Sequence, residues 1–192
     1  MLHYAKPTRE SVLENWWFIN EFLSDEEIER IELNVKGLDY KDATIVANSN
    51  VNEEYRKSSI KWIDFNYEWI YDKLWHWANI ANDDIWGFDI EGFKDECQYT
   101  HYKAPDGHYD WHTDIGGNGI NHRKISAIVQ LSDNSEFKGG NLEFLNGKDP
   151  IQIEMWKGRC VLFPSFYLHR ITPILEGERK SLVQWISGAP FK

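Results

Sequence analysis

The pattern of hydrophobic and polar positions changes near residue 86. Before that point, apolar residues recur at helical spacing in two segments. After it, short runs alternate between apolar and polar side chains and are separated by Gly, Pro, Asn and Asp, which is typical of antiparallel strands. In the clearest run the odd-numbered positions are all aliphatic, namely Ile125, Ala127, Val129 and Leu131.

The first helical segment carries its own start signal. Ser24 can accept a hydrogen bond from the Glu27 amide while the Glu27 side chain reaches back, which is a capping box. We therefore expect a helix from about 25 to 36 that ends at Gly37.

A second helix is expected from about 66 to 81, ending in a turn at Asn82-Asp83-Asp84. The intervening residues 38–59 are polar and have no sustained period. This composition predicts a loop, or a lid that closes over a site.

The second half of the chain predicts a set of short strands. They lie at about 96–102, 108–114, 125–131, 141–145, 151–155, 159–163, 168–173 and 179–187. Seven or eight strands preceded by helices indicate an α+β, mainly β protein, with a double-stranded β-helix (jelly-roll) core and helices packed outside. Since no repeat or linker interrupts residues 1–192, we expect one domain, with an N-terminal strand and helices in 1–85 and the jelly-roll core in 86–188.

Charge and composition narrow the possible partners. The net charge is -10 and no cluster of Lys or Arg occurs, so we expect no nucleic-acid and no membrane partner. No apolar stretch approaches the roughly 20 residues that span a bilayer, and the N-terminus MLHYAKPTRE has no signal-peptide core, so a cytoplasmic protein is expected. A monomer is favoured, but the sequence leaves the oligomeric state open. Cys97 and Cys160 are expected to be buried thiols. The many aromatic rings favour core packing over a stacking surface for glycans or peptides.

Candidate metal ligands occur in Tyr109-Asp110-Trp111-His112-Thr113-Asp114. In a strand, residues two apart project from the same face, so His112 and Asp114 could bind one metal ion. His108 and Asp110 form a rival pair with the same parity. Alternation alone leaves the choice between the two pairs open, and a lone His-x-Asp is weak evidence.

His169 supplies a third ligand from a later predicted strand. Two imidazoles and one carboxylate occupy one face of an octahedral metal, which is the ligand set of iron(II) oxygenases, although zinc could also bind it. Ten residues later, period 2 places Arg179, Ser181, Val183 and Trp185 on one strand face. A guanidinium there can pair with the far carboxylate of a dicarboxylate held by the metal.

The chain resembles the prolyl 4-hydroxylase superfamily of iron(II), 2-oxoglutarate-dependent oxygenases, over about residues 12–188. The resemblance rests on five stretches. They are the opening strand and helix in FINEFLSDEEIERI, the pattern Tyr102…Gly107-His-Tyr109-Asp-Trp-His112-Thr-Asp114, the strand from Arg123 to Leu131 with its polar turn, the paired glycines Gly139-Gly140, and His169…Pro173…Gly177-Glu-Arg179. The resemblance selects His112 and Asp114 over His108 and Asp110.

The resemblance implies a mechanism and roles for further residues. Iron(II) is held by His112, Asp114 and His169, which are the catalytic and metal-binding residues. The co-substrates are 2-oxoglutarate and O2, with ascorbate as a possible reductant. Succinate and CO2 are released, and an unactivated C–H bond of a peptidyl proline becomes an alcohol. Arg179, Tyr102 and Ser181 would bind 2-oxoglutarate, while Arg123 and Trp185 would contact the substrate. Segments 38–59 and 132–140 would close over it.

Two alternatives remain open from the sequence. The first is hydroxylation of a free amino acid or another small metabolite, because family likeness does not fix the substrate. The second, from a different class, is a non-catalytic binding module for glycans or peptides that would ignore 2-oxoglutarate.

Overall fold

The computed structural model describes residues 16–42, 54–117 and 119–191. Two antiparallel β-sheets form its core, and two α-helices pack against one of them. The fold is therefore mainly β with few helices, as the sequence predicts. Within these described ranges, no helix has the length and apolar character needed to cross a bilayer.

The larger sheet has the strand order β1-β11-β7-β13-β5-β4-β2, with β8 paired to β13. Its strands are β1 (Trp17–Ile19), β2 (Lys41–Asp42), β4 (Ser59–Ile63), β5 (Cys97–Lys103), β7 (Arg123–Gln130), β8 (Phe137–Gly139), β11 (Cys160–Pro164) and β13 (Ile174–Ser187).

The smaller sheet has the order β10-β9-β12-β6-β3. Its strands are β3 (Arg56–Lys57), β6 (His108–His112), β9 (Leu142–Leu145), β10 (Pro150–Ile153) and β12 (His169–Ile171).

The first helix confirms the sequence prediction. Helix α1 spans Asp25–Lys36, and both hydrogen bonds of the capping box form between Ser24 and Glu27. Its buried face is made by Ile28, Ile31 and Val35, which recur at the spacing of one helix face. The helix therefore begins at its cap and packs through one apolar stripe.

The second helix differs from the prediction at its end. Helix α2 spans Glu68–Ala81, but the expected turn at Asn82-Asp83-Asp84 is wrong. These residues continue in a π-helical turn, Asn82–Trp86, that ends at Gly87 in the left-handed conformation (φ 65°). The Asn82 side chain bonds both the amide and the carbonyl of Phe88. It thereby satisfies backbone groups after the last turn, a function that composition alone does not reveal.

The expected loop at 38–59 is partly wrong. Strand β2 and strand β3 lie at its two ends, and Ser59 begins β4. Residues 43–53, which are half of the predicted lid, lie outside the described residues, as do the first residues of the family resemblance. Short strands of two residues carry too little periodicity to be recognised in a polar segment.

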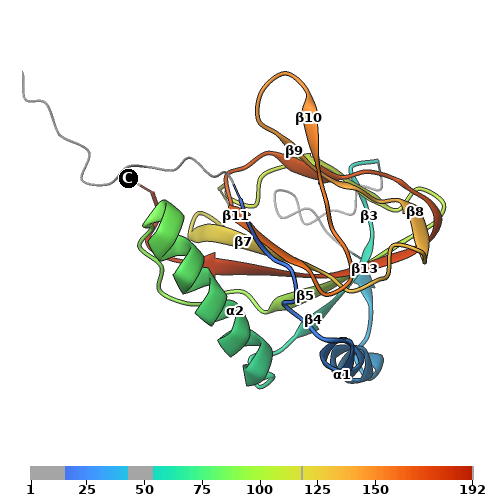
Figure 1. Ribbon diagram of the computed structural model, residues 1–192, viewed down its shortest axis with the longest axis horizontal. Coiled ribbons are helices and arrows are strands. Elements are labelled where there is room, and N and C mark those ends of the chain that lie inside the picture. Colours follow the sequence, from blue (N-terminus) through green and yellow to red (C-terminus); the bar gives the residue numbers. More distant parts are fainter. Residues whose placement is uncertain (1–15, 43–53, 118, 192) are drawn as a thin grey trace, which may run out of the picture.

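Alternation along β7 separates two cores. Ile125, Ala127 and Val129 face the helices in one hydrophobic cluster, while Ile128 faces the smaller sheet in the other. In Figure 1, α1 and α2 lie on one side of the larger sheet and β9, β10 and β3 lie on the other. The even-numbered positions of β7 therefore point into the space between the sheets, where a site can form.

The predicted burial of both cysteines is confirmed, and three of the tryptophans pack against the core as expected. Cys97 and Cys160 are free and fully buried, and burial raises the pKa of the Cys97 thiol to about 12. Trp69, Trp75 and Trp77 pack against the core between helices and sheet. Core packing thus accounts for these rings.

Candidate active site

His112 and His169 lie side by side on adjacent strands. They are directly paired in the register between β6 and β12, and their ring centroids are 4.1 Å apart. Asp114 lies just beyond the end of β6, where its backbone amide donates to the Ser165 carbonyl at 2.9 Å. One ligand atom from each of these three buried residues lies within 4.8 Å of the others. The structure therefore brings the three predicted ligands together.

Backbone carbonyls orient both imidazoles. His112 Nδ1 donates to the Asp110 carbonyl at 2.7 Å, and His169 Nδ1 donates to the Tyr167 carbonyl at 2.9 Å. This fixes the tautomer and leaves each Nε2 with a free lone pair. The two Nε2 atoms lie 3.7 Å and 3.6 Å from the oxygens of Asp114. Three ligand atoms thus converge on one point, as metal binding requires.

Burial and neighbouring charges shift the pKa values of His112 and Asp114. Burial lowers the pKa of His112 to about 3, with a further contribution from His169. Burial alone would raise the pKa of Asp114, but the two histidines and the Ser126 hydroxyl lower it below its usual range. Neutral imidazoles and an ionised carboxylate are the forms that bind a divalent cation.

A β-bulge separates the two His-x-Asp pairs. Pairing between β12 and β6 shifts between His169↔His112 and Ile171↔Tyr109, so two residues of β6 oppose one of β12. Tyr109 therefore shares the inner face with His112, and the two rings stack at 3.5 Å. His108 bonds instead to the backbone carbonyls of Asp106 and Glu54. The sequence predicts that His108 and His112 lie on the same strand face, and in the folded strand they do not.

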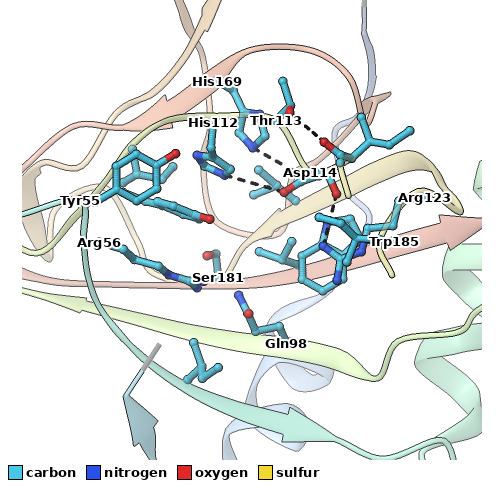
Figure 2. Close-up of a pocket in the computed structure, with 18 of the residues that line it drawn as sticks. Tyr55, Arg56, Gln98, His112, Thr113, Asp114, Arg123, His169, Ser181 and Trp185 are labelled. Atoms are coloured by element: carbon cyan, nitrogen blue, oxygen red, sulfur yellow. Dashed lines mark hydrogen bonds and ion pairs between the residues drawn. The ribbon is translucent and has the colours of Figure 1, made fainter. Parts of the chain in front are cut away.

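The cluster opens into a cavity of about 500 Å³ between the sheets. Figure 2 shows the two histidines and Asp114 at one side of this space, with Ser181 and Gln98 across from them. The predicted strand face is confirmed, because its four residues all line the cavity: Arg179, Ser181, Val183 and Trp185. The volume is in the range of small-molecule sites and leaves room for two ligands.

Arg179 is the most deeply buried of the three arginines that line this cavity. It is 2% exposed, and neither Nη1 nor Nη2 has a hydrogen-bond partner among the described residues. Burial lowers its pKa to about 10, so the guanidinium is still charged at neutral pH. Tyr102 is buried nearby, with its ring centroid 5.7 Å from Cζ of Arg179. Burial raises the pKa of Tyr102, so its hydroxyl remains a donor.

Gly140, the second of the paired glycines, packs against Arg179. Gly140 has φ 62°, and a Cβ at this position would collide with Ile174 and lie 3.1 Å from Cδ of Arg179. Only glycine tolerates both the conformation and this close approach.

Arg123 and Trp185 line the side of the cavity that lies away from Tyr55 and Arg56 (Figure 2). The Arg123 guanidinium lies 3.7 Å from the Trp185 ring centroid. Arg123 Nε donates to Asp95 at 2.9 Å. Trp185 Nε1 is buried without a partner among the described residues. Both predicted substrate contacts therefore line the cavity, and one of them offers an unused donor.

The segment 132–140 borders a second cavity. None of its residues lines the main cavity. Phe137, Gly139 and Gly140 line a separate cavity of about 360 Å³, which Arg179 also borders. Pairing of β8 with β13 holds Phe137–Gly139 in this position, and closure of 132–140 over a substrate stays a prediction.

Sequence reasoning missed three polar residues of the site. Ser126 donates to Asp114 at 2.6 Å, and Asp95 holds Arg123. Arg56 lines the cavity beside Tyr55 and Tyr109. The alternation in β7 could have identified Ser126, since it shares the inner face with Ile128. Nothing in the sequence pattern singles out Asp95 or Arg56, which precede recognisable strands.

Comparison with known families adds a decisive observation. Residues 97–187, which contain the whole triad and Arg179, match the model of the 2OG-Fe(II) oxygenase superfamily. These residues form a 2OG-Fe(II) oxygenase core. The matched segment begins at β5 and ends with β13.

Individual relatives of this oxygenase core are hydroxylases. A PKHD-type hydroxylase of Synechococcus sp. is 37% identical over 79 residues, which is 41% of this chain and 36% of the relative. The curated relatives are matched over only 30–41% of their own length.

Solved structures share the fold over most of the chain. A Pseudomonas putida prolyl-4-hydroxylase has a TM-score of 0.70 at 21% identity, covering 92% of this chain and 94% of that one. A Trichoplax adhaerens prolyl hydroxylase, solved with a hypoxia inducible factor peptide fragment, has a TM-score of 0.75 at 20% identity, covering 92% and 84%. At these identities the likeness shows a common fold.

Proposed function

We propose that this protein is an iron(II), 2-oxoglutarate-dependent dioxygenase that hydroxylates an unactivated C–H bond of a peptidyl proline. The observation that carries the proposal is the buried guanidinium of Arg179 in the same cavity as the triad, whose Nη1 and Nη2 have no hydrogen-bond partner among the described residues. A buried cation without a partner is costly. A dicarboxylate that also chelates a metal would supply the missing anion.

The residues fit the implied metal and co-substrate. His112, Asp114 and His169 offer two imidazole nitrogens and one carboxylate on one side of the cavity, and this facial set leaves further metal positions open. Bound iron(II) with 2-oxoglutarate and O2 supplies the oxidising chemistry, in which the co-substrate leaves as succinate and CO2 and the substrate carbon gains a hydroxyl.

The chain's own groups bind and orient the reactants. Arg179 would pair bidentately with the 5-carboxylate of 2-oxoglutarate. Tyr102 and Ser181 would donate hydroxyl hydrogen bonds to the same group. Ser126 holds Asp114 through its 2.6 Å hydrogen bond, which fixes the direction of the ligand oxygen. Arg123 and Trp185 would contact the substrate on the side of the cavity away from Arg56.

A peptide is the favoured substrate, and a free amino acid or other small molecule is the alternative. The Trichoplax adhaerens neighbour was solved with a peptide fragment, which supports a peptide. The unpartnered Trp185 Nε1 also suits a peptide, because it can donate to a backbone carbonyl.

Three finer points complete the proposal. The two sheets are those of a jelly-roll, or double-stranded β-helix, which is supported by the antiparallel order of both sheets. Residues 1–192 form one domain, supported by two hydrophobic clusters that share the larger sheet. Two free, buried cysteines suit a reducing compartment such as the cytoplasm.

Turnover of 2-oxoglutarate tests the proposal. Replacing His112, Asp114 or His169 by Ala should abolish succinate formation. The matched control is His108→Ala, which removes a histidine of the same strand whose nitrogens bond to the backbone carbonyls of Asp106 and Glu54, outside the metal-ligand cluster. That variant should retain most of the turnover. A folded, iron-loaded wild type that ignores 2-oxoglutarate would favour the binding-module alternative.

A further inference from the structure

The cavity carries more positive than negative side chains. Its charged lining residues are one acid, Asp114, and three arginines, Arg56, Arg123 and Arg179. This excess is unexpected in a chain whose net charge is -10. Since buried charges require partners, each arginine of the cavity must be accounted for.

Two of the three arginines have partners. Arg123 Nε lies 2.9 Å from Asp95 Oδ2, so this pair is neutral. Arg179 pairs with the 5-carboxylate of 2-oxoglutarate under the proposed function, on which this inference rests. In that loaded state the charges of a divalent metal, Asp114, the dicarboxylate and Arg179 cancel. One buried positive charge therefore remains, on Arg56.

Arg56 has no acidic partner in the described part of the chain. It is 7% exposed, and its Nε donates to the neutral hydroxyl of Ser58 at 3.0 Å. Its Cζ lies 4.4 Å from the Tyr109 ring centroid. This cation–π contact stabilises the positive charge but does not neutralise it. Among the described residues, no carboxylate oxygen lies within 4.0 Å of its guanidinium.

The position of Arg56 relates it to the reacting centre. The same Tyr109 ring that contacts Arg56 stacks on the metal-ligand candidate His112 at 3.5 Å. In Figure 2 the Arg56 side chain extends into the cavity on the side of Tyr55, while Arg123 and Trp185 lie on the other side. An anionic group bound to Arg56 could therefore belong to the same small molecule whose reacting carbon lies at the metal site.

We propose that Arg56 binds a carboxylate of the substrate, so that the enzyme selects substrates with an acidic group near the hydroxylated carbon. A guanidinium offers the planar pair of donors that a carboxylate accepts. Ile60 and Trp62 line the cavity next along the chain, and they provide an apolar surface for the carbon skeleton. The carboxylate could belong to a free amino acid or to an acidic residue of a peptide.

Matched carboxylate and carboxamide probes test this inference. The protein is loaded anaerobically with iron(II) and 2-oxoglutarate, and probe binding is followed by intrinsic tryptophan fluorescence. One pair is L-proline with L-prolinamide, and the other is acetyl-Pro-Glu-amide with acetyl-Pro-Gln-amide. We expect the acid of at least one pair to bind the wild type tenfold or more tightly than its amide.

Two variants assign the preference to Arg56. Arg56→Gln should remove the preference for the acid while the affinity for 2-oxoglutarate stays unchanged. Lys57→Gln is the control, because it removes the neighbouring charge, whose Nζ bonds to the Pro105 carbonyl at 3.3 Å outside the cavity. This control should keep the preference. The responding pair distinguishes a free amino acid from a peptide.

The contradicting outcomes are separable. Lack of any acid preference in the wild type, including lack of binding by every probe, overturns the inference. So does a preference that survives Arg56→Gln. Weaker 2-oxoglutarate binding in Arg56→Gln also overturns it, because Arg56 would then serve the co-substrate. If the wild type fails to bind 2-oxoglutarate at all, the proposed function itself has failed.

Discussion

Replacing Arg179 by Met should change stability and co-substrate binding in opposite directions. Met has a similar length and no charge, so it can fill the same space between the sheets. In the ligand-free protein the arginine is a buried cation whose Nη atoms have no partner among the described residues. Its removal should therefore stabilise the apo-protein, while 2-oxoglutarate loses its anchor.

The size of the stability gain follows from the pKa of Arg179. Burial lowers this pKa from 12.5 to about 10, which corresponds to roughly 3 kcal/mol of disfavoured charge. Replacement of buried charges by apolar residues of similar volume stabilises proteins by about 1–4 kcal/mol. We expect the free energy of unfolding of the Arg179→Met apo-protein to rise within that range.

The loss of co-substrate affinity should be larger. Removing one partner of a buried, hydrogen-bonded charge pair costs about 2–5 kcal/mol. Since about 1.4 kcal/mol is tenfold in affinity, the Kd for 2-oxoglutarate should rise roughly 30-fold to several thousand-fold. Binding of the metal alone should change little, because Arg179 is not among the three clustered ligands.

Urea denaturation of the apo-protein and titration with 2-oxoglutarate in the presence of manganese(II) measure both effects. Lys180→Met is the matched control: it removes the same charge from the next residue, whose Nζ lies 3.4 Å from Glu32 outside the cavity. This control should leave the Kd for 2-oxoglutarate unchanged. Unchanged 2-oxoglutarate affinity in Arg179→Met, or a destabilised apo-protein, would refute the reasoning.

Three further predictions concern the surroundings of the site. Asp95→Asn weakens the hydrogen bond that holds Arg123 and should cost about 1–3 kcal/mol in chemical denaturation; no loss would mean that the pair does not hold Arg123. Ser24→Ala removes the cap of α1 and should cost about 1 kcal/mol, whereas Ser24→Gly should cost only a few tenths. Burial lowers the pKa of His101 below 6.5, so unfolding takes up a proton and wild-type stability falls as pH drops below about 6.5. In urea denaturation from pH 7.5 to 5, His101→Gln should lose less stability than the wild type, and equal losses would contradict this origin.

Much of the β-core could be predicted because alternation and burial agree there. The run from Ile125 to Leu131 is buried on both faces yet still alternates between the two cores. Strand β13 is longer than predicted, starting at Ile174 rather than near 179. Its first residues are largely exposed and pair with β8, and this edge pairing leaves no apolar period to detect.

The convergence of the three metal-ligand candidates could be predicted from residue type, but its geometry could not. Register between β6 and β12 places His112 opposite His169, and strand register is a tertiary property. The bulge near Asp110 changes which face each side chain takes. The expectation that alternate residues share one face assumes a strand without a bulge. The sequence alone could therefore not choose between His108 and His112 as the metal ligand.

Arg56 shows why the rest of the cavity was not predicted. It lies in a strand of only two residues, and it reaches the site because β3 pairs with β6. Its place in the cavity is thus set by a long-range pairing. Its significance arises from charge balance, which becomes visible only when the cavity's members are known.

Anaerobic addition of iron(II) and 2-oxoglutarate to the apo-protein tests the central claim most directly. The account predicts a weak visible metal-to-ligand charge-transfer band that requires both additions. The band should persist in His108→Ala, and in Arg179→Met it should vanish at modest 2-oxoglutarate concentration. A folded, iron-loaded wild type that shows no band at saturating 2-oxoglutarate would contradict the account.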